Sequence, residues 1–106
     1  MFARFLEMRV RPEKKPELIN KLKLGVLPIL KKYRGFFDLI TLEVETDPTR
    51  FYAISLWHEK VDAEKYEREN FVKVKTIYEP FLTMPLVVRL CTVDDSIPTK
   101  VIGVAA

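Results

Sequence analysis

Trp57 and His58 are the only tryptophan and the only histidine of the chain, and they stand side by side in the segment FYAISLWHEK, residues 51–60. An indole ring can form the wall of an aromatic ligand pocket, and an imidazole can transfer a proton near neutral pH. If the segment is a strand, Trp57 shares one face with Ala53 and Ser55, whose small side chains leave room in front of the ring. The pattern predicts either a pocket wall at Trp57 or a core tryptophan packed by other side chains.

Two further residues are candidates for acid–base or electrostatic roles. We expect His58 to be exposed at a strand end, because the sequence around it offers neither a nucleophile nor a second histidine for a metal. Arg9 is either a cation for a developing oxyanion or one half of a structural ion pair.

Other signatures of known chemistry are missing from the sequence. It contains no glycine-rich phosphate loop, no dinucleotide-binding fingerprint and no serine-hydrolase motif, which argues against kinases, dinucleotide-dependent oxidoreductases and hydrolases. Cys91 is the single cysteine, so an internal disulfide and a Cys/His zinc cluster are both ruled out. We therefore expect neither a bound metal nor a cofactor.

The composition predicts one globular domain. The chain has 106 residues, 48% of them hydrophobic and 31% charged, which is enough for a single core. The net charge of +3 arises from mixed runs such as EKVDAEKYERE and not from one basic block, so we expect no nucleic-acid partner. No run of about 18 apolar residues and no signal-peptide pattern is present, and we expect a soluble, cytoplasmic protein without membrane contact.

The elements that must position these residues follow from hydrophobic periodicity. Alternating apolar residues predict a strand over 2–11, and apolar residues at three- and four-residue steps predict a helix from about 13 to 32. Gly25 and Pro28 inside that helix predict a kink or break, and Gly35 after it predicts a glycine C-cap.

The second half of the domain repeats this alternation. Strand-like runs at 36–45 and 50–58, separated by a turn at TDPT, predict a β-hairpin. A helix from about 60 to 81 and a strand over 85–93 follow. We place the domain at residues 1–94 and a C-terminal tail at 95–106, with Val101, Ile102 and Val104 left to bury.

The order β-α-β-β-α-β predicts an α+β, ferredoxin-like fold with a four-stranded antiparallel sheet and both helices on one face. Its strands are apolar at odd and even positions, the pattern of a sheet covered on both sides. Because two helices cover only one face, we expect a second copy of the chain on the other, in a homodimer. The alternative is a monomer whose tail covers the sheet. Arg89, in the fourth strand, is expected to pair with Glu43 or Asp38, and the alternative is a clamp for an anion or phenolate.

Residues 27–71 resemble the antibiotic biosynthesis monooxygenase domain, a family of dimeric α+β barrels, and the resemblance extends over residues 2–94. Its most telling parts are Arg34-Gly35-Phe36, the SLW that ends the third strand and the DAEKYE that begins the second helix. Family members include haem-degrading enzymes, quinol monooxygenases and enzymes that oxidise polycyclic phenols with molecular oxygen and no metal or flavin. The resemblance implies a site between the sheet and the helices.

In the haem-degrading members that site uses an asparagine, a tryptophan and an axial histidine, whose positions fall at Met8, Trp57 and about Lys75. Only the tryptophan matches, so the resemblance does not imply haem degradation. Phenol oxidation instead needs a dry aromatic pocket with a donor or cation at the phenolate oxygen. For that chemistry the resemblance implies catalytic roles for Trp57, Arg9 and Tyr66, and contacts to a small aromatic ligand from Phe71, Tyr78, Phe36 and Met8.

Two functions remain open at this level. The first is a small cofactor-independent monooxygenase acting on an aromatic, phenolic or quinol-type compound. The second is a non-catalytic dimeric α/β barrel that binds a small ligand or serves as a stress-related accessory protein. An enclosed pocket of about 300 Å³ or more beside Trp57 would favour the enzyme, and a tightly packed Trp57 would favour the second function.

Overall fold

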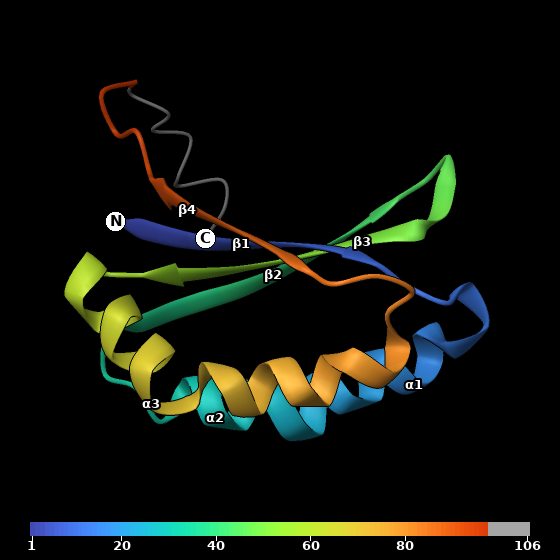
Figure 1. Ribbon diagram of the computed structural model, residues 1–106. Helices are drawn as coiled ribbons and strands as arrows, with labels where there is room; N and C mark the ends of the chain where they lie inside the picture. Colours follow the sequence, from blue (N-terminus) through green and yellow to red (C-terminus); the bar gives the residue numbers. More distant parts are fainter. Residues whose placement is uncertain (98–106) are drawn as a thin grey trace.

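A four-stranded antiparallel sheet forms one layer of the molecule, and the helices form the other (Figure 1). The structure is a computed structural model that describes residues 1–97. The strands are β1 (Phe2–Arg9), β2 (Phe36–Val44), β3 (Asp47–Trp57) and β4 (Val87–Thr92), in the spatial order β2-β3-β1-β4. The predicted α+β, ferredoxin-like arrangement is confirmed. The tail residues Val101, Ile102 and Val104 lie outside the described residues.

The first helical stretch is broken, as Gly25 and Pro28 predict. A 3-10 turn η1 (Pro12–Lys14) leads into α1 (Lys15–Lys21), a π-helical turn η2 (Leu22–Val26) follows, and α2 (Leu27–Lys31) completes the stretch. The N–H of Leu27 donates to the carbonyl of Leu22, five residues earlier. Pro28 has no N–H to donate, and the widened turn lies directly before it.

The structure explains the glycine at position 35 by a close contact and not by the predicted C-cap. No glycine of residues 1–97 has a positive φ, so the expected left-handed C-cap at Gly35 is wrong. A Cβ at this position would overlap the side chain of Asp62. Gly35 is therefore the residue that lets the chain after α2 pass close to α3 (Lys60–Tyr78).

The β2–β3 hairpin turns earlier than the Asp-Pro step suggests. The turn residues are Glu45 and Thr46, and Asp47 already pairs with Val44 across the hairpin. Asp47 still shapes the hairpin through its side chain, because its Oδ1 accepts hydrogen bonds from the backbone N–H of Thr49, at 3.0 Å, and from the Thr49 hydroxyl, at 2.6 Å.

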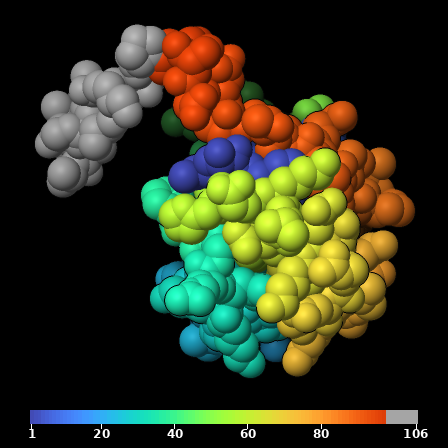
Figure 2. Space-filling model, turned by 90° about the vertical axis from the view of Figure 1, so that its left-hand side faces the viewer, coloured from blue at the N-terminus to red at the C-terminus, as the bar shows by residue number. Residues whose placement is uncertain are grey.

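The core lies between the sheet and the helices. Alternate residues of β1 and β3 point into it, and α3 buries Ala63, Tyr66, Val74 and Tyr78 before ending in the 3-10 turn η3 (Glu79–Phe81). Figure 2 shows α3 and the end of the first helical stretch side by side beneath β1 and β4. None of the helices among residues 1–97 is both long and apolar enough to cross a membrane.

The opposite side of the sheet, which we call the outer sheet face, carries no helix (Figure 1). Strand register and alternation place on it Phe5, Ile40, Leu42, Tyr52, Ile54, Leu56 and Val87. Of these, Ile40, Leu42 and Val87 are exposed. Arg89 lies on the same face and pairs with Glu7, its neighbour on β1, so the predicted pairing with Glu43 or Asp38 is wrong.

Candidate functional site

Arg4 is the charged residue that the fold places in the core. On β1 it belongs to the same alternate series as Leu6 and Met8, and only 2% of it is exposed. It stands opposite Ser55 of β3 and Leu90 of β4. The sequence analysis missed Arg4, although an arginine in an otherwise apolar alternate series is a signal visible in the sequence.

The guanidinium of Arg4 is only partly satisfied. Nη1 donates to Oε1 of Glu67 at 3.0 Å, and the guanidinium carbon lies 4.4 Å from the ring centre of Phe71 and 5.5 Å from that of Tyr66. Nη2 is buried and has no hydrogen-bond partner among residues 1–97. A buried donor without a partner costs about 1–3 kcal/mol, and more when it is charged. The arrangement leaves one strong donor free inside an aromatic environment.

A small internal cavity adjoins this guanidinium. Its volume is about 10 Å³, room for about one water molecule. Apolar side chains from both layers line it, together with Arg4, Ser55, Tyr66, Phe71 and Tyr78. The cavity therefore has a positively charged end and aromatic walls.

The two buried tyrosines of the cavity, Tyr66 and Tyr78, are unsuited to act as bases. Burial raises the pKa of Tyr66 far above its ordinary value, although the nearby charge of Arg4 partly opposes this shift. Burial raises the pKa of Tyr78 in the same way. Both phenol groups consequently stay protonated throughout the neutral range.

Trp57 is packed on every side. It is 0% exposed, its Nε1 donates to Oγ of Ser55 at 2.9 Å, and its ring stacks on Tyr66 with centres 5.1 Å apart. Tyr33 and Phe36 meet it edge-on, with ring centres at 5.9 and 5.6 Å. These rings fill the expected room in front of the indole, a packing that fits the alternative of a core tryptophan.

The sheet separates Arg9 from this cluster. Arg9 lies opposite Arg50 on the outer sheet face, and its Nη1 lies 3.3 Å from Oδ2 of Asp47 and 3.2 Å from Oγ1 of Thr49. Arg9 therefore lies on the face of the sheet opposite the buried cluster at Trp57, because successive residues of a strand point to opposite faces. The alternative of a structural ion pair fits instead.

The structure distributes the other predicted residues as follows. Tyr66, Phe71 and Tyr78 line the cavity at Arg4. Phe36 and Trp57 do not line it, and Phe36 packs edge-on against Trp57. Met8 is buried opposite Phe51, further along β1, and the structure does not bring it to the cavity at Arg4.

His58 is exposed, as predicted, and its ring lies 5.3 Å from that of Phe37. Among residues 1–97 no three His, Cys, Asp or Glu side chains are grouped so that they could hold a metal ion.

No protein-family model matches the chain, and no curated protein matches it. Solved structures, in contrast, are similar to this chain. A candidate antibiotic biosynthesis monooxygenase from Nitrosomonas europaea is 14% identical, with a TM-score of 0.71, over 88% of this chain and 98% of its own.

Two structures from Streptomyces are similar at the same level. SnoaB of Streptomyces nogalater, a cofactor-independent oxygenase solved as the mutant N63A, is 14% identical, with a TM-score of 0.71, over 92% of this chain and 96% of its own. The monooxygenase ActVA-Orf6 of Streptomyces coelicolor, solved with the ligand nanaomycin D, is 17% identical, with a TM-score of 0.75, over 91% of this chain and 89% of its own. At these identities the likeness concerns the fold, and the chain has the fold of the antibiotic biosynthesis monooxygenases.

Proposed function

We propose that this protein is a cofactor-independent monooxygenase that oxidises a phenolic or quinol-type compound beside Arg4. The observation that carries the proposal is the free Nη2 of Arg4, a buried cationic donor among aromatic rings. A phenolate oxygen placed there would satisfy this nitrogen, and the aromatic body of the ligand would lie against Phe71 and Tyr66. The likeness of fold to two named oxygenases supports the same class of reaction.

The proposed reaction needs only the substrate and molecular oxygen as reactants. Arg4 stabilises the phenolate and so favours loss of the phenolic proton. The electron-rich ring then passes an electron to oxygen, and the two radicals combine at a ring carbon that carries hydrogen. One oxygen atom becomes the new carbonyl of a quinone. The other leaves as water with the hydrogens of the phenolic O–H and the ring C–H. Tyr66, which stays protonated, is proposed as a second donor to the anionic oxygen.

The cavity must widen before it can hold an aromatic ring. Phe71 is the lining residue best placed to yield, because it is only half-buried and comes from the surface of α3. Trp57 is proposed to act through Tyr66 as a positioning residue, since the stacked rings fix where the Tyr66 ring lies. A homodimer that covers the outer sheet face completes the proposed assembly.

The tight packing of Trp57 and the volume of the cavity favour a second candidate. A core with room for about one water molecule is what a non-catalytic barrel would have. Such a protein would bind a small aromatic anion at Arg4 without turning it over.

Oxygen consumption by the purified, metal-free protein with a panel of hydroquinones and polycyclic phenols separates the two candidates. We expect uptake above the uncatalysed rate that falls about 100-fold in Arg4→Met, the size of effect seen when an oxyanion donor is removed. Arg68→Met, at an exposed position of α3, is the matched control and keeps the wild-type rate. An equal rate in Arg4→Met would overturn the site, and saturable binding without uptake would favour the binding protein.

A further inference from the structure

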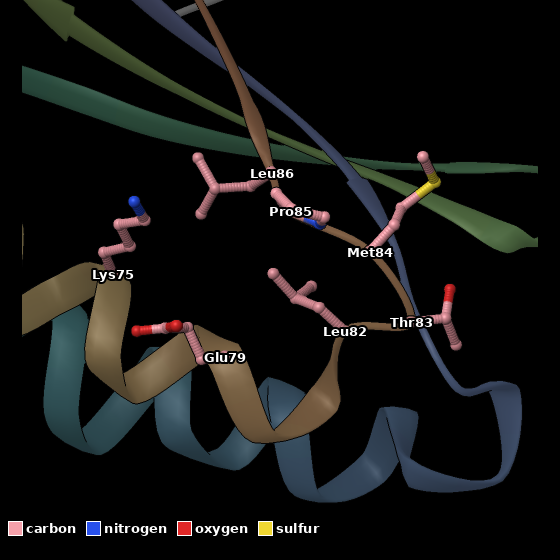
Figure 3. Close-up of a pocket in the computed structure, with 7 residues that line it drawn as sticks. All are labelled: Lys75, Glu79, Leu82, Thr83, Met84, Pro85 and Leu86. Carbon is pink, nitrogen blue, oxygen red and sulfur yellow. The ribbon is translucent and has the colours of Figure 1, made fainter.

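A groove of about 320 Å³ opens between the C-terminal part of α3 and the segment that leads into β4 (Figure 3). Leu82, Met84, Pro85 and Leu86 give it an apolar lining, and α3 contributes Lys75 and Glu79, with Thr83 at one end. The volume falls within the range of sites for small organic molecules, about 300–1,000 Å³. We call this site the β4 groove.

The β4 groove lies one helical turn from the cavity at Arg4. Glu67, Phe71, Lys75 and Glu79 follow one another at four-residue intervals, so they form a row along one face of α3. Phe71 lines the cavity and contacts Arg4, and Lys75, the next in the row, lines the groove. The rise along that turn is about 5–6 Å, less than the length of a two-ring aromatic molecule.

The sheet side of the same space is apolar and partly open. Val88 stands opposite Leu6, and Leu90 stands opposite Arg4, so both face the helical layer. Leu90 is nevertheless 56% exposed, which means that the helices do not cover β4 there. A ligand between α3 and β4 would meet an apolar strand on one side and the row of α3 residues on the other.

The β4 groove carries two charged side chains, those of Lys75 and Glu79. Neither Lys75 nor Glu79 forms an ion pair in the part of the chain that the structure describes. Figure 3 shows both side chains attached to α3, on the side of the groove opposite Met84 and Thr83. An ammonium group at the rim of an apolar groove is complementary to an acidic group on an otherwise apolar ligand.

We propose that the β4 groove holds the far end of the substrate and that this end carries a carboxylate, with Lys75 as its counterion. This inference rests on the proposed function, because the phenolic end of the same molecule is placed at Arg4. The substrate class narrows accordingly to hydroxyaromatic carboxylates whose two polar groups lie at opposite ends of the ring system. Lys75 is then a specificity-determining residue, and Glu79 disfavours ligands with a second acidic group nearby.

Calorimetric titration with two probes tests the proposal. The probes are 6-hydroxy-2-naphthoate and 2-naphthol, which share the ring system and the phenol but differ in the carboxylate at the far end. The wild-type protein should bind the carboxylate probe about three- to tenfold more tightly, as expected for an ion pair at a partly desolvated site. Lys75→Met should remove that preference. Lys73→Met is the matched control, because Lys73 is exposed on α3 and does not line the groove.

The possible outcomes distinguish a failure of the proposed role of the β4 groove from a failure of the proposed function at Arg4. If the wild type binds both probes equally, or if Lys75→Met keeps the preference, the role of the β4 groove is overturned while the site at Arg4 stands. If Arg4→Met leaves 2-naphthol binding unchanged, the site at Arg4 fails, and the preference for the carboxylate probe still reports on Lys75. If neither probe binds the wild type, both proposals are overturned.

Discussion

The structure gives Arg4 and Trp57 roles different from those that their residue types suggest, because Trp57 packs in the core and Arg4 is the candidate ligand-binding residue. The tryptophan is the conspicuous residue of the sequence, yet it is enclosed by Tyr66, Tyr33 and Phe36 and keeps its single donor satisfied by Ser55. The arginine, inconspicuous among three arginines in the first eleven residues, is the one whose buried Nη2 has no hydrogen-bond partner among residues 1–97. At the residue scale the candidate site depends on an unsatisfied hydrogen bond and not on an unusual residue type.

The hydrogen bond between Trp57 and Ser55 gives a prediction about stability. Ser55→Ala leaves the buried Nε1 without its acceptor, and we expect a loss of about 1–3 kcal/mol in the free energy of unfolding. Urea denaturation followed by circular dichroism measures it. In a Trp57→Phe background, which has no such donor, Ser55→Ala should cost much less, and an equal loss in both backgrounds would contradict the assigned role.

Features of the helices and strands were predictable from the sequence where residues of the same turn determine them. The break in the first helix follows from Gly25 and Pro28, which act within their own turn. The exact turn of the hairpin and the role of Gly35 were not predictable, because both depend on contacts with distant residues. The overlap of a Gly35 side chain with Asp62, for example, exists only once α3 has packed against the chain after α2.

The two helix-associated glycines should respond to alanine in opposite ways. Gly35→Ala forces a Cβ into the Asp62 side chain, and we expect a loss of about 1–3 kcal/mol, as for other overpacked sites. At Gly25 the added Cβ would meet only Cδ1 of Ile77, at 3.5 Å, so alanine should stabilise the helical stretch by about 0.5–1 kcal/mol. Thermal unfolding of the two variants measures both changes, and a shift of the same sign in both would refute the assignment.

We expect Asp47 in the β2–β3 hairpin to make a pH-dependent contribution to the free energy of unfolding. Hydrogen bonds from Thr49, aided by Arg9 and Arg50, hold the pKa of Asp47 below its usual value. A lowered carboxyl pKa adds stability that is complete above the unfolded-state pKa of about 3.9 and is lost as the pH falls through the folded-state pKa. Asp47→Asn should therefore be less stable than wild type at pH 7, with the difference shrinking as the pH falls below about 3.9. Urea midpoints at pH 7 and pH 3 check this, and a difference independent of pH would be the contrary result.

For the molecule as a whole, the sequence best predicted that one face of the sheet is left without a helix to cover it. Strands apolar on both faces, with only two helices to cover them, predict a further partner, and the outer sheet face exposes the apolar residues Ile40, Leu42 and Val87. The cavity at Arg4 was not predictable in this way. It arises because β1, β3 and α3 bring together residues that are about 50 to 70 positions apart in the chain.

We predict that a second copy of the chain covers the outer sheet face. Light scattering at micromolar concentration should give the mass of a dimer for the wild type. Leu42→Glu, at a position 44% exposed on that face, should give a monomer, because a charge there would be buried without a partner. Val72→Glu changes a residue 76% exposed on α3 and should remain dimeric. A monomeric wild type would contradict the prediction.

Oxygen-18 labelling shows most directly whether the partly unpaired guanidinium of Arg4 directs a monooxygenation. A phenol that the panel identifies as a substrate is converted under labelled oxygen gas by the wild type and by Arg4→Met, and the quinone is analysed by mass spectrometry. We predict one labelled oxygen atom in each quinone from the wild type and about 100-fold slower formation by the variant. A quinone without the label, or equal rates for the two proteins, would contradict the claim.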